Sequence, residues 1–183
     1  MSQTRGSTAP GSQSDPAERA TRVPLVAAKE AFDRFYTRQY QPVVTLGFAM
    51  TGSREVARDL AQEVFVDAFR KWDQIETPDA WVRAVLVNKS RSWMRRRYRE
   101  ARALLRLQPP ASAPSPESSA EDSEFWAAVR SLPTRQAQVI ALFYLDRLPA
   151  AEIGAILGIS ESTVRVHLTR GRRGLADQLG LEL

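Results

Sequence analysis

The chain has 183 residues, enough for one domain or two small ones, and 43% of them are hydrophobic, as expected of a folded protein. The absence of cysteine excludes disulfides, thiolate metal sites and thiol nucleophiles, and a single histidine cannot form a metal site alone, so we expect no metal and no cofactor. The formal charge of +5, carried mostly by arginine, favours a polyanionic partner, because the planar guanidinium matches phosphate groups and guanine edges.

Residues 1–24 are rich in Ser, Thr, Gly, Gln and Pro and lack the apolar run of a secretion signal. This composition predicts a disordered tail. No uninterrupted apolar stretch in the chain is long enough to span a bilayer. We therefore expect a cytoplasmic protein without membrane insertion.

Residues 53–72 form a strongly amphipathic pattern with helical spacing. One broad face should belong to the core and carries Ala57, Leu60, Ala61, Val64, Phe65, Ala68 and Trp72. The opposite face is charged, and such faces are usually only solvated. Val66 stands among its polar residues, however, and an apolar side chain rimmed by charge is more natural in a contact with another protein. Both interpretations remain open from the pattern alone.

Residues 81–106 hold the most concentrated positive charge of the chain. Seven arginines lie between Arg91 and Arg106 against the single acidic Glu100, and aromatic residues are interleaved with them. Basic side chains alternating with aromatic rings suit an unpaired nucleic-acid strand, whose phosphates attract cations and whose bases stack on rings. In the competing interpretation, Trp81 and Trp93 are core residues and the arginines form a solvated face. We expect Trp81 to be core, and the pattern does not decide for Trp93.

A segment rich in proline and serine, residues 107–122, predicts an extended acidic linker. It separates a helical module at residues 25–106 from a second one at residues 123–183. Neither module shows the alternation of strands, so the fold class predicted is all-α, with two small helical domains. The linker could keep the modules soluble and apart, or thread through a basic channel of a partner.

Residues 150–173 read as a helix-turn-helix. Gly158 lets the chain reverse between the helices, Gly154 is small, and the Ser160 hydroxyl can cap the second helix. Val164, Leu168, Gly171 and Leu175 should face inward. This combination predicts a second helix that enters a DNA major groove, whereas a basic helical hairpin without a ligand is the alternative.

The outward side of that second helix carries Ser162, Val166, Thr169, Arg170 and Arg173. Arg165 and Arg172 lie on a flank, where long cationic side chains reach phosphates more easily than base edges. For His167, beside this stripe, a contact with DNA and a merely solvated ring are both open.

In order and spacing the chain resembles the sigma-70 family, and specifically its extracytoplasmic-function group, which keeps only regions 2 and 4. Four segments carry the resemblance: FDRFYTRQYQPVVTLGFAMTG, ARDLAQEVFVDAFRKW, PDAWVRAVLVNKSRSWMRRR, and SLPTRQAQVIALFYLDRLPAAEIGAILGISESTVRVHLTRGRRGL. The resemblance implies that residues 25–106 are region 2, which binds polymerase and captures the −10 element, and that residues 123–183 are region 4, which reads the −35 element. It implies an alternative sigma factor without catalytic residues.

The resemblance also implies partners and roles for particular residues. The implied partners are core RNA polymerase, duplex −35 DNA and the single-stranded −10 element, and it leaves room for an anti-sigma factor. The polymerase-binding set is Asp59, Gln62, Glu63 and Val66. The −10 set is Asn88, Lys89, Arg91, Ser92 and Arg95. The −35 set is Ser162, Thr163, Arg165, Val166, His167, Thr169, Arg170 and Arg173.

Family members often carry a polar residue where Val166 stands. Valine can contact a thymine methyl group but cannot donate to a base edge, so the resemblance leaves the −35 preference of this chain open. Since the sequence ends shortly after Leu175, no appended regulatory domain is expected.

Two other classes compete with this interpretation. A conventional helix-turn-helix regulator would act on duplex DNA without polymerase, but the first hundred residues lack the alternating strands and helices of a receiver domain. A serine recombinase would need a nucleophile near arginines. Ser90 and Ser92 are so placed, but they lie within a helical pattern and no base is identifiable.

Overall fold

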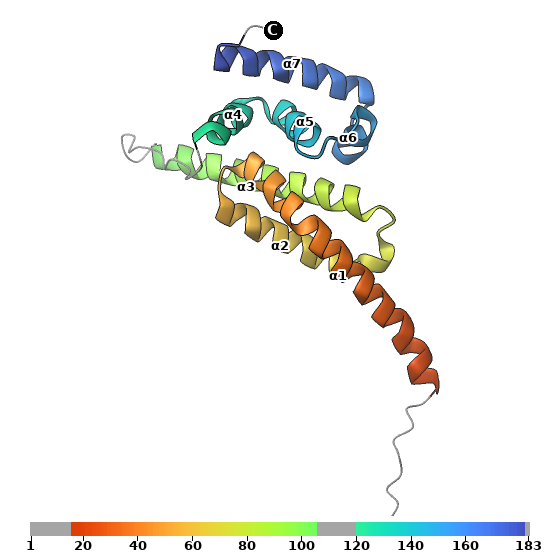
Figure 1. Ribbon diagram of the computed structural model, residues 1–183. Coiled ribbons are helices and arrows are strands. Elements are labelled where there is room, and N and C mark those ends of the chain that lie inside the picture. The colour runs from red at the N-terminus through yellow and green to blue at the C-terminus, as the bar shows by residue number, and fades with distance from the viewer. Residues whose placement is uncertain (1–15, 106–119, 182–183) are drawn as a thin grey trace, which may run out of the picture.

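A computed structural model describes residues 16–105 and 120–181, and the side chains of residues 27–103 and 124–181. All regular elements in these ranges are helices, so the all-α prediction is confirmed. In chain order they are α1 (Pro16–Thr51), α2 (Arg54–Arg70), the short 3-10 helix η1 (Trp72–Gln74), α3 (Pro78–Leu105), α4 (Ala120–Ser131), α5 (Thr134–Tyr144), α6 (Ala150–Leu157) and α7 (Glu161–Leu179). Figure 1 shows α1 to α3 as one module and α4 to α7 as a second module lying against it.

The N-terminal module is built around the amphipathic helix α2. The Ser53 side chain caps this helix by accepting a hydrogen bond from the Val56 N–H at 3.3 Å. The predicted inward face is confirmed, because six of its members are buried: Ala57, Leu60, Ala61, Val64, Phe65 and Ala68. Trp72 lies beyond α2 in η1 and is half-buried, with its ring 5.2 Å from that of Phe32. The packing of this face against α1 and α3 fixes which side of α2 points outward.

The C-terminal module contains the predicted helix-turn-helix in α6 and α7. Gly158 ends α6 with a φ of 65°, a conformation that residues with a side chain rarely adopt. A Cβ atom on Gly154 would lie 2.7 Å from the Ile159 carbonyl oxygen, which explains why this position is small. The Ser160 hydroxyl accepts a hydrogen bond from the Thr163 N–H at 3.2 Å and caps α7, as predicted. These contacts set the angle at which α7 leaves α6.

The inward stripe of α7 is also confirmed. Val164, Gly171 and Leu175 are buried, and Leu168 is half-buried against the core. The opposite side of α7 is therefore exposed along most of its length.

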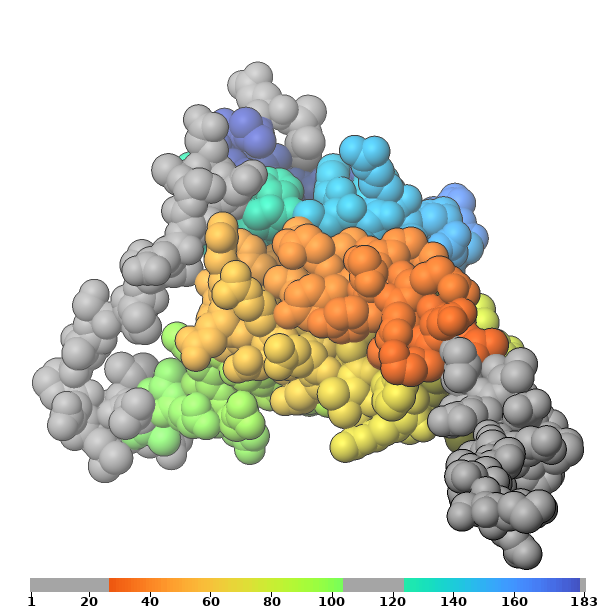
Figure 2. Space-filling model, turned by 60° about the horizontal axis from the view of Figure 1, so that its bottom comes forward, coloured from red at the N-terminus to blue at the C-terminus, as the bar shows by residue number. Residues whose placement is uncertain are grey.

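The two modules share one continuous core. Buried side chains of α5, α6 and α7 belong to the same cluster as those of α1, α2 and α3. Figure 2 shows the C-terminal module, in teal to blue, in direct contact with α1, in orange. Because α1 packs against α4 and α5, and α3 packs against α6, the modules lie together in this structure rather than apart.

Two boundaries differ from the sequence prediction. The disordered tail was expected to extend to residue 24, but α1 begins at Pro16. Proline is favoured in the first turn of a helix, and the Ala, Glu and Arg residues that follow it have high helix propensity, which outweighed the polar composition. The linker was expected to extend to residue 122, but α4 begins at Ala120. Residues 1–15 of the tail and 106–119 of the linker lie outside the described residues.

Candidate polymerase and nucleic-acid interfaces

The outer face of α7 places most of the −35 set on the surface. The exposed members are Ser162, Arg165, Val166, Thr169, Arg170 and Arg173. Val166 is 46% exposed, a large fraction for an apolar side chain in the middle of a helix. An exposed apolar residue flanked by cations suits a surface that meets both base methyl groups and phosphates.

Thr163 and His167 are the half-buried members of the −35 set. The Thr163 hydroxyl lies 2.7 Å from that of Ser160 and so belongs to the cap of α7. The Nδ1 atom of His167 is buried and has no hydrogen-bond partner among the described residues. These two side chains therefore lie at the edge of the exposed stripe of α7 rather than at its centre.

The flanking arginines of α7 are held in different ways. Arg165 forms an ion pair with Glu161 one turn earlier. Arg172 donates to the Tyr144 hydroxyl at 3.1 Å, and its guanidinium lies 5.1 Å from the centre of the Phe143 ring. Arg172 is therefore turned toward α5, whereas Arg170 and Arg173 have no ion pair in the described part of the chain.

The polymerase-binding set lies together on the outer face of α2. Asp59, Gln62 and Glu63 are exposed, and the exposed fraction of Val66 is 48%. The structure adds a residue that the sequence analysis missed. Phe69, three residues after Val66 and so on the same side of the helix, is 56% exposed, with its ring 5.0 Å from that of Phe32. Val66 and Phe69 form an exposed apolar pair beside three polar residues, a composition typical of a protein contact.

The −10 set is divided between two sides of α3. Arg91, Ser92 and Arg95 line a cleft between α3 and the C-terminal module. Lys89 instead turns toward α2, where its ammonium group lies 2.9 Å from Glu63 and 3.2 Å from Asp67. The hydrogen bond to Glu63 and the negative charges of both carboxylates raise the pKa of Lys89, although partial burial acts in the opposite direction.

Asn88 is exposed. The ion pair of Lys89 with Glu63 joins the −10 set to the polymerase-binding set. Trp93, which the sequence left undecided, is half-buried, with the Arg97 guanidinium 5.3 Å from its ring centre.

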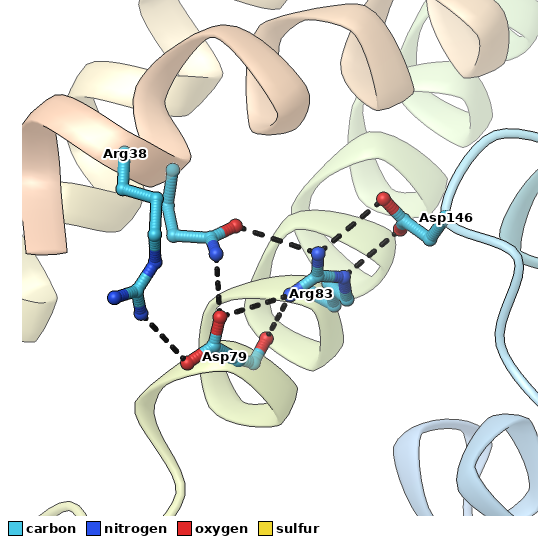
Figure 3. Close-up of polar contacts among 5 residues, drawn as sticks. Arg38, Asp79, Arg83 and Asp146 are labelled. Atoms are coloured by element: carbon cyan, nitrogen blue, oxygen red, sulfur yellow. Dashed lines mark hydrogen bonds and ion pairs between the residues drawn. The ribbon is translucent and has the colours of Figure 1, made fainter.

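A polar network joins the two modules near the start of α3 (Figure 3). The Arg83 guanidinium binds the Asp146 carboxylate through two hydrogen bonds, of 2.9 and 3.4 Å. The two side chains are only 11% and 7% exposed. Arg83 lies in α3 and Asp146 in the turn after α5, so this nearly buried ion pair spans the contact between the modules.

The same network fixes the N-terminal end of α3. Arg83 also donates to the Asp79 carbonyl oxygen at 2.8 Å and to the Gln39 amide oxygen at 3.4 Å. Gln39 and Arg38 of α1 both donate to the Asp79 carboxylate (Figure 3). The charge of Arg83 is therefore compensated by groups from α1, α3 and the C-terminal module.

None of the helices in residues 16–105 and 120–181 combines the length and the apolar character needed to cross a membrane.

Comparison with known proteins gives matches in both modules. Residues 35–100 match the family model for sigma-70 region 2, and residues 122–175 match that for sigma-70 region 4. The chain is 32% identical to the ECF RNA polymerase sigma factor SigF of Caulobacter vibrioides over 71% of its own length and 74% of that protein. It is also 32% identical to the ECF RNA polymerase sigma factor SigE of Mycolicibacterium smegmatis, over 84% of its own length, but it spans only 63% of that relative.

The fold has a similar counterpart among solved structures. The sigma factor RpoE of Bartonella quintana, in complex with the anti-sigma factor NepR, superposes with a TM-score of 0.69 and 23% sequence identity. The similarity covers 84% of this chain and 99% of that one. The region 2 and region 4 matches, the identity to SigF and the shared helical fold agree: the chain belongs to the extracytoplasmic-function group of sigma-70 RNA polymerase sigma factors.

Proposed function

We propose that this chain is an alternative sigma factor that binds core RNA polymerase and directs it to specific promoters. One observation carries the proposal: the chain has three exposed helical faces of different composition, and they follow one another in the order of sigma regions 2 and 4. α2 offers an acidic face with an apolar pair, α3 offers arginines and aromatic rings, and α7 offers an exposed basic face on a helix-turn-helix.

In this proposal, α7 reads the −35 element by entering the major groove. The helix is held by α6 at one end and by the inward stripe that packs on α5, so its outward side is free to approach DNA. Arg170 contacts base edges, Val166 lies against a thymine methyl group, and Arg173 binds a phosphate.

α3 would hold the non-template strand of the −10 element after the duplex opens. Unstacking a base costs a few kcal/mol, which contacts with phosphates and a binding surface for the base must offset. Arg91 and Arg95 supply the phosphate contacts, and Asn88 and Ser92 supply hydrogen bonds of the kind that distinguish bases.

The outer face of α2 would dock on core polymerase. Asp59 and Glu63 give charge complementarity to a basic partner surface, and Val66 and Phe69 give the apolar area that stabilises the contact once it has formed. We place the complex in the cytoplasm, with the DNA and polymerase it serves.

We also propose an anti-sigma factor as a regulatory partner. The RpoE chain of similar fold was solved with its anti-sigma factor NepR, and this supports a protein partner of that kind for the present chain.

Mixing the purified chain with core polymerase and a promoter fragment tests the proposal. We expect co-elution of the chain with core on size-exclusion chromatography, and a mobility shift of the promoter that requires both components. A chain that shifts duplex DNA alone and never associates with core would be a conventional helix-turn-helix regulator, and the proposal would be wrong.

A further inference from the structure

A cleft of about 930 Å³ lies between the two modules. One wall is the second half of α3, the other is formed by α4 and the start of α5, and the end of α1 closes one side. Its apolar lining includes Met50, Val87, Met94, Val129 and Leu132. The volume falls within the range of sites that hold small organic ligands.

The charge of this cleft is one-sided. Five arginines line it: Arg91, Arg95 and Arg99 from α3, Arg130 from α4 and Arg135 from α5. Among the side chains that the structure describes, no Asp or Glu lines the cleft, and none of the five arginines forms an ion pair. Like charges held on facing walls repel each other. The arrangement in which the two modules lie together, called the closed arrangement below, therefore favours an anion between them.

Arg130 shows how poorly this charge is compensated. Its guanidinium is half-buried, and its hydrogen bond is to a neutral group, the Ala49 carbonyl oxygen, at 3.4 Å. Burial lowers the pKa of Arg130 below its ordinary value. Arg135 likewise donates to a neutral group, the Gln138 amide oxygen, at 3.2 Å.

The N-terminus of α5 opens into the same cleft. Thr134 and Arg135, its first two residues, line the cleft, and no side chain caps this end of the 11-residue helix. The first turn of α5 also contains no acidic residue. The N-terminal backbone N–H groups of α5 and the positive end of its dipole therefore lie at a cleft that the arginines of α3 also line, and both features attract phosphate groups in proteins.

Two buried polar atoms of α3 lie at this cleft without a hydrogen bond in the described part of the chain. Ser90 is only 2% exposed, and neither its hydroxyl nor the Arg91 Nε has a hydrogen-bond partner among the described residues. Both residues line the cleft. Buried polar groups are usually satisfied, so these two atoms are available to a polar ligand in the cleft.

The geometry points to a binding site for a nucleotide with two or more phosphates, held between α3 and the N-terminus of α5. The phosphates lie among the arginines of both walls and the free N–H groups of α5. The Tyr98 ring, which lines the cleft and is 68% exposed, offers a surface on which the base stacks.

Such a ligand stabilises the closed arrangement, because it binds only where both walls are present. Since Arg91 and Arg95 also belong to the −10 set, the nucleotide competes with the −10 strand. This last consequence alone rests on the proposed function.

Isothermal titration calorimetry of the full chain tests the site, with inorganic pyrophosphate, GTP and ATP as probes at low ionic strength. We expect binding of one pyrophosphate per chain, and tighter binding of the nucleotides because of the stacked base. Arg99→Gln and Arg135→Gln each remove a guanidinium from one of the two walls. Each should weaken binding about tenfold, because one hydrogen bond to a charged group is lost. Arg102→Gln is the matched control, because Arg102 lies in α3, is exposed and does not line the cleft.

Three results would overturn the proposal. Absence of binding by pyrophosphate and by both nucleotides would show that the cleft is not a phosphate site. This result is expected if the occupant is instead an acidic peptide, from residues 107–122 of this chain or from a partner. Full affinity in Arg135→Gln would show that α3 alone attracts the probe. An equal loss of affinity in Arg102→Gln would show that binding depends on the overall charge of the chain rather than on the arginines of the cleft. All of these measurements use the chain without polymerase, so failure of the proposed sigma function would leave them unaffected.

Discussion

Asp146→Asn removes one charge of the ion pair that joins the two modules and preserves the shape of the side chain. In the variant, Arg83 stays nearly buried, with a guanidinium whose main carboxylate partner is gone. Loss of one member of a buried pair costs about 3–5 kcal/mol. Arg83 keeps its hydrogen bonds to the Asp79 carbonyl and to Gln39, and the Asp79 carboxylate remains 3.9 Å away. We therefore expect the low end of that range, about 3 kcal/mol.

The assay is thermal unfolding followed by calorimetry. For a chain of this size, 1 kcal/mol shifts the midpoint by about 2–4 °C, so Asp146→Asn should lower it by roughly 6–12 °C. The double variant Arg83→Met/Asp146→Leu should unfold close to the wild type, because a buried ion pair replaced by apolar groups often costs nothing. The control is Glu161→Gln, which breaks an exposed pair on α7 and should change stability by less than about 1 kcal/mol.

Two results would refute this reasoning. A midpoint within 1 °C of the wild type in Asp146→Asn would show that the pair does not hold the modules together. A loss in Arg83→Met/Asp146→Leu equal to the sum of the losses in Arg83→Met alone and Asp146→Leu alone would show that the two residues act independently.

Three further outcomes follow from the described contacts. Asp59→Lys/Glu63→Lys should abolish binding to core polymerase while circular dichroism stays unchanged, because both carboxylates are exposed; undiminished co-elution with core would contradict the docking surface. Arg170→Ala should weaken −35-dependent initiation by about 1–3 kcal/mol, and unaltered promoter preference in a run-off assay would count against its place in the groove. Gly154→Ala should destabilise the helix-turn-helix by about 1–3 kcal/mol, because the added Cβ would lie 2.7 Å from the Ile159 carbonyl oxygen; an unchanged unfolding midpoint would show that the turn relaxes freely.

Periodicity was sufficient to predict the helices that bury one face. The inward residues of α2 and α7 recur every three or four positions, so their burial follows from the sequence alone. The cap at Ser160 and the turn at Gly158 were equally predictable, because each depends on a local backbone conformation that few residues satisfy.

Contacts between distant segments could not be predicted in this way. Arg83 and Asp146 are 63 positions apart, and no local pattern marks them as partners. The linker composition left open whether the modules lie apart, whereas in the structure the buried side chains of α1, α2 and α3 form one cluster with those of α5, α6 and α7. The start of α1 was placed too late because the polar composition of residues 16–24 concealed good helix formers.

In the candidate surfaces, too, positions set by helical spacing could be predicted from the sequence, whereas contacts between helices could not. The outward position of Asp59, Val66 and Arg170 was visible from helical spacing, and the structure exposes all three. Phe69 could have been found by extending the Val66 stripe by three residues, since it is exposed on the same side. The ion pair between Lys89 and Glu63 could not, because it depends on how α2 and α3 pack.

Run-off transcription with purified cognate core polymerase on fragments of the source genome tests the central claim most directly. The account predicts discrete start sites that appear only when the chain is added and that disappear with Asp59→Lys/Glu63→Lys. Transcription that is the same with and without the chain, on every fragment, would contradict it.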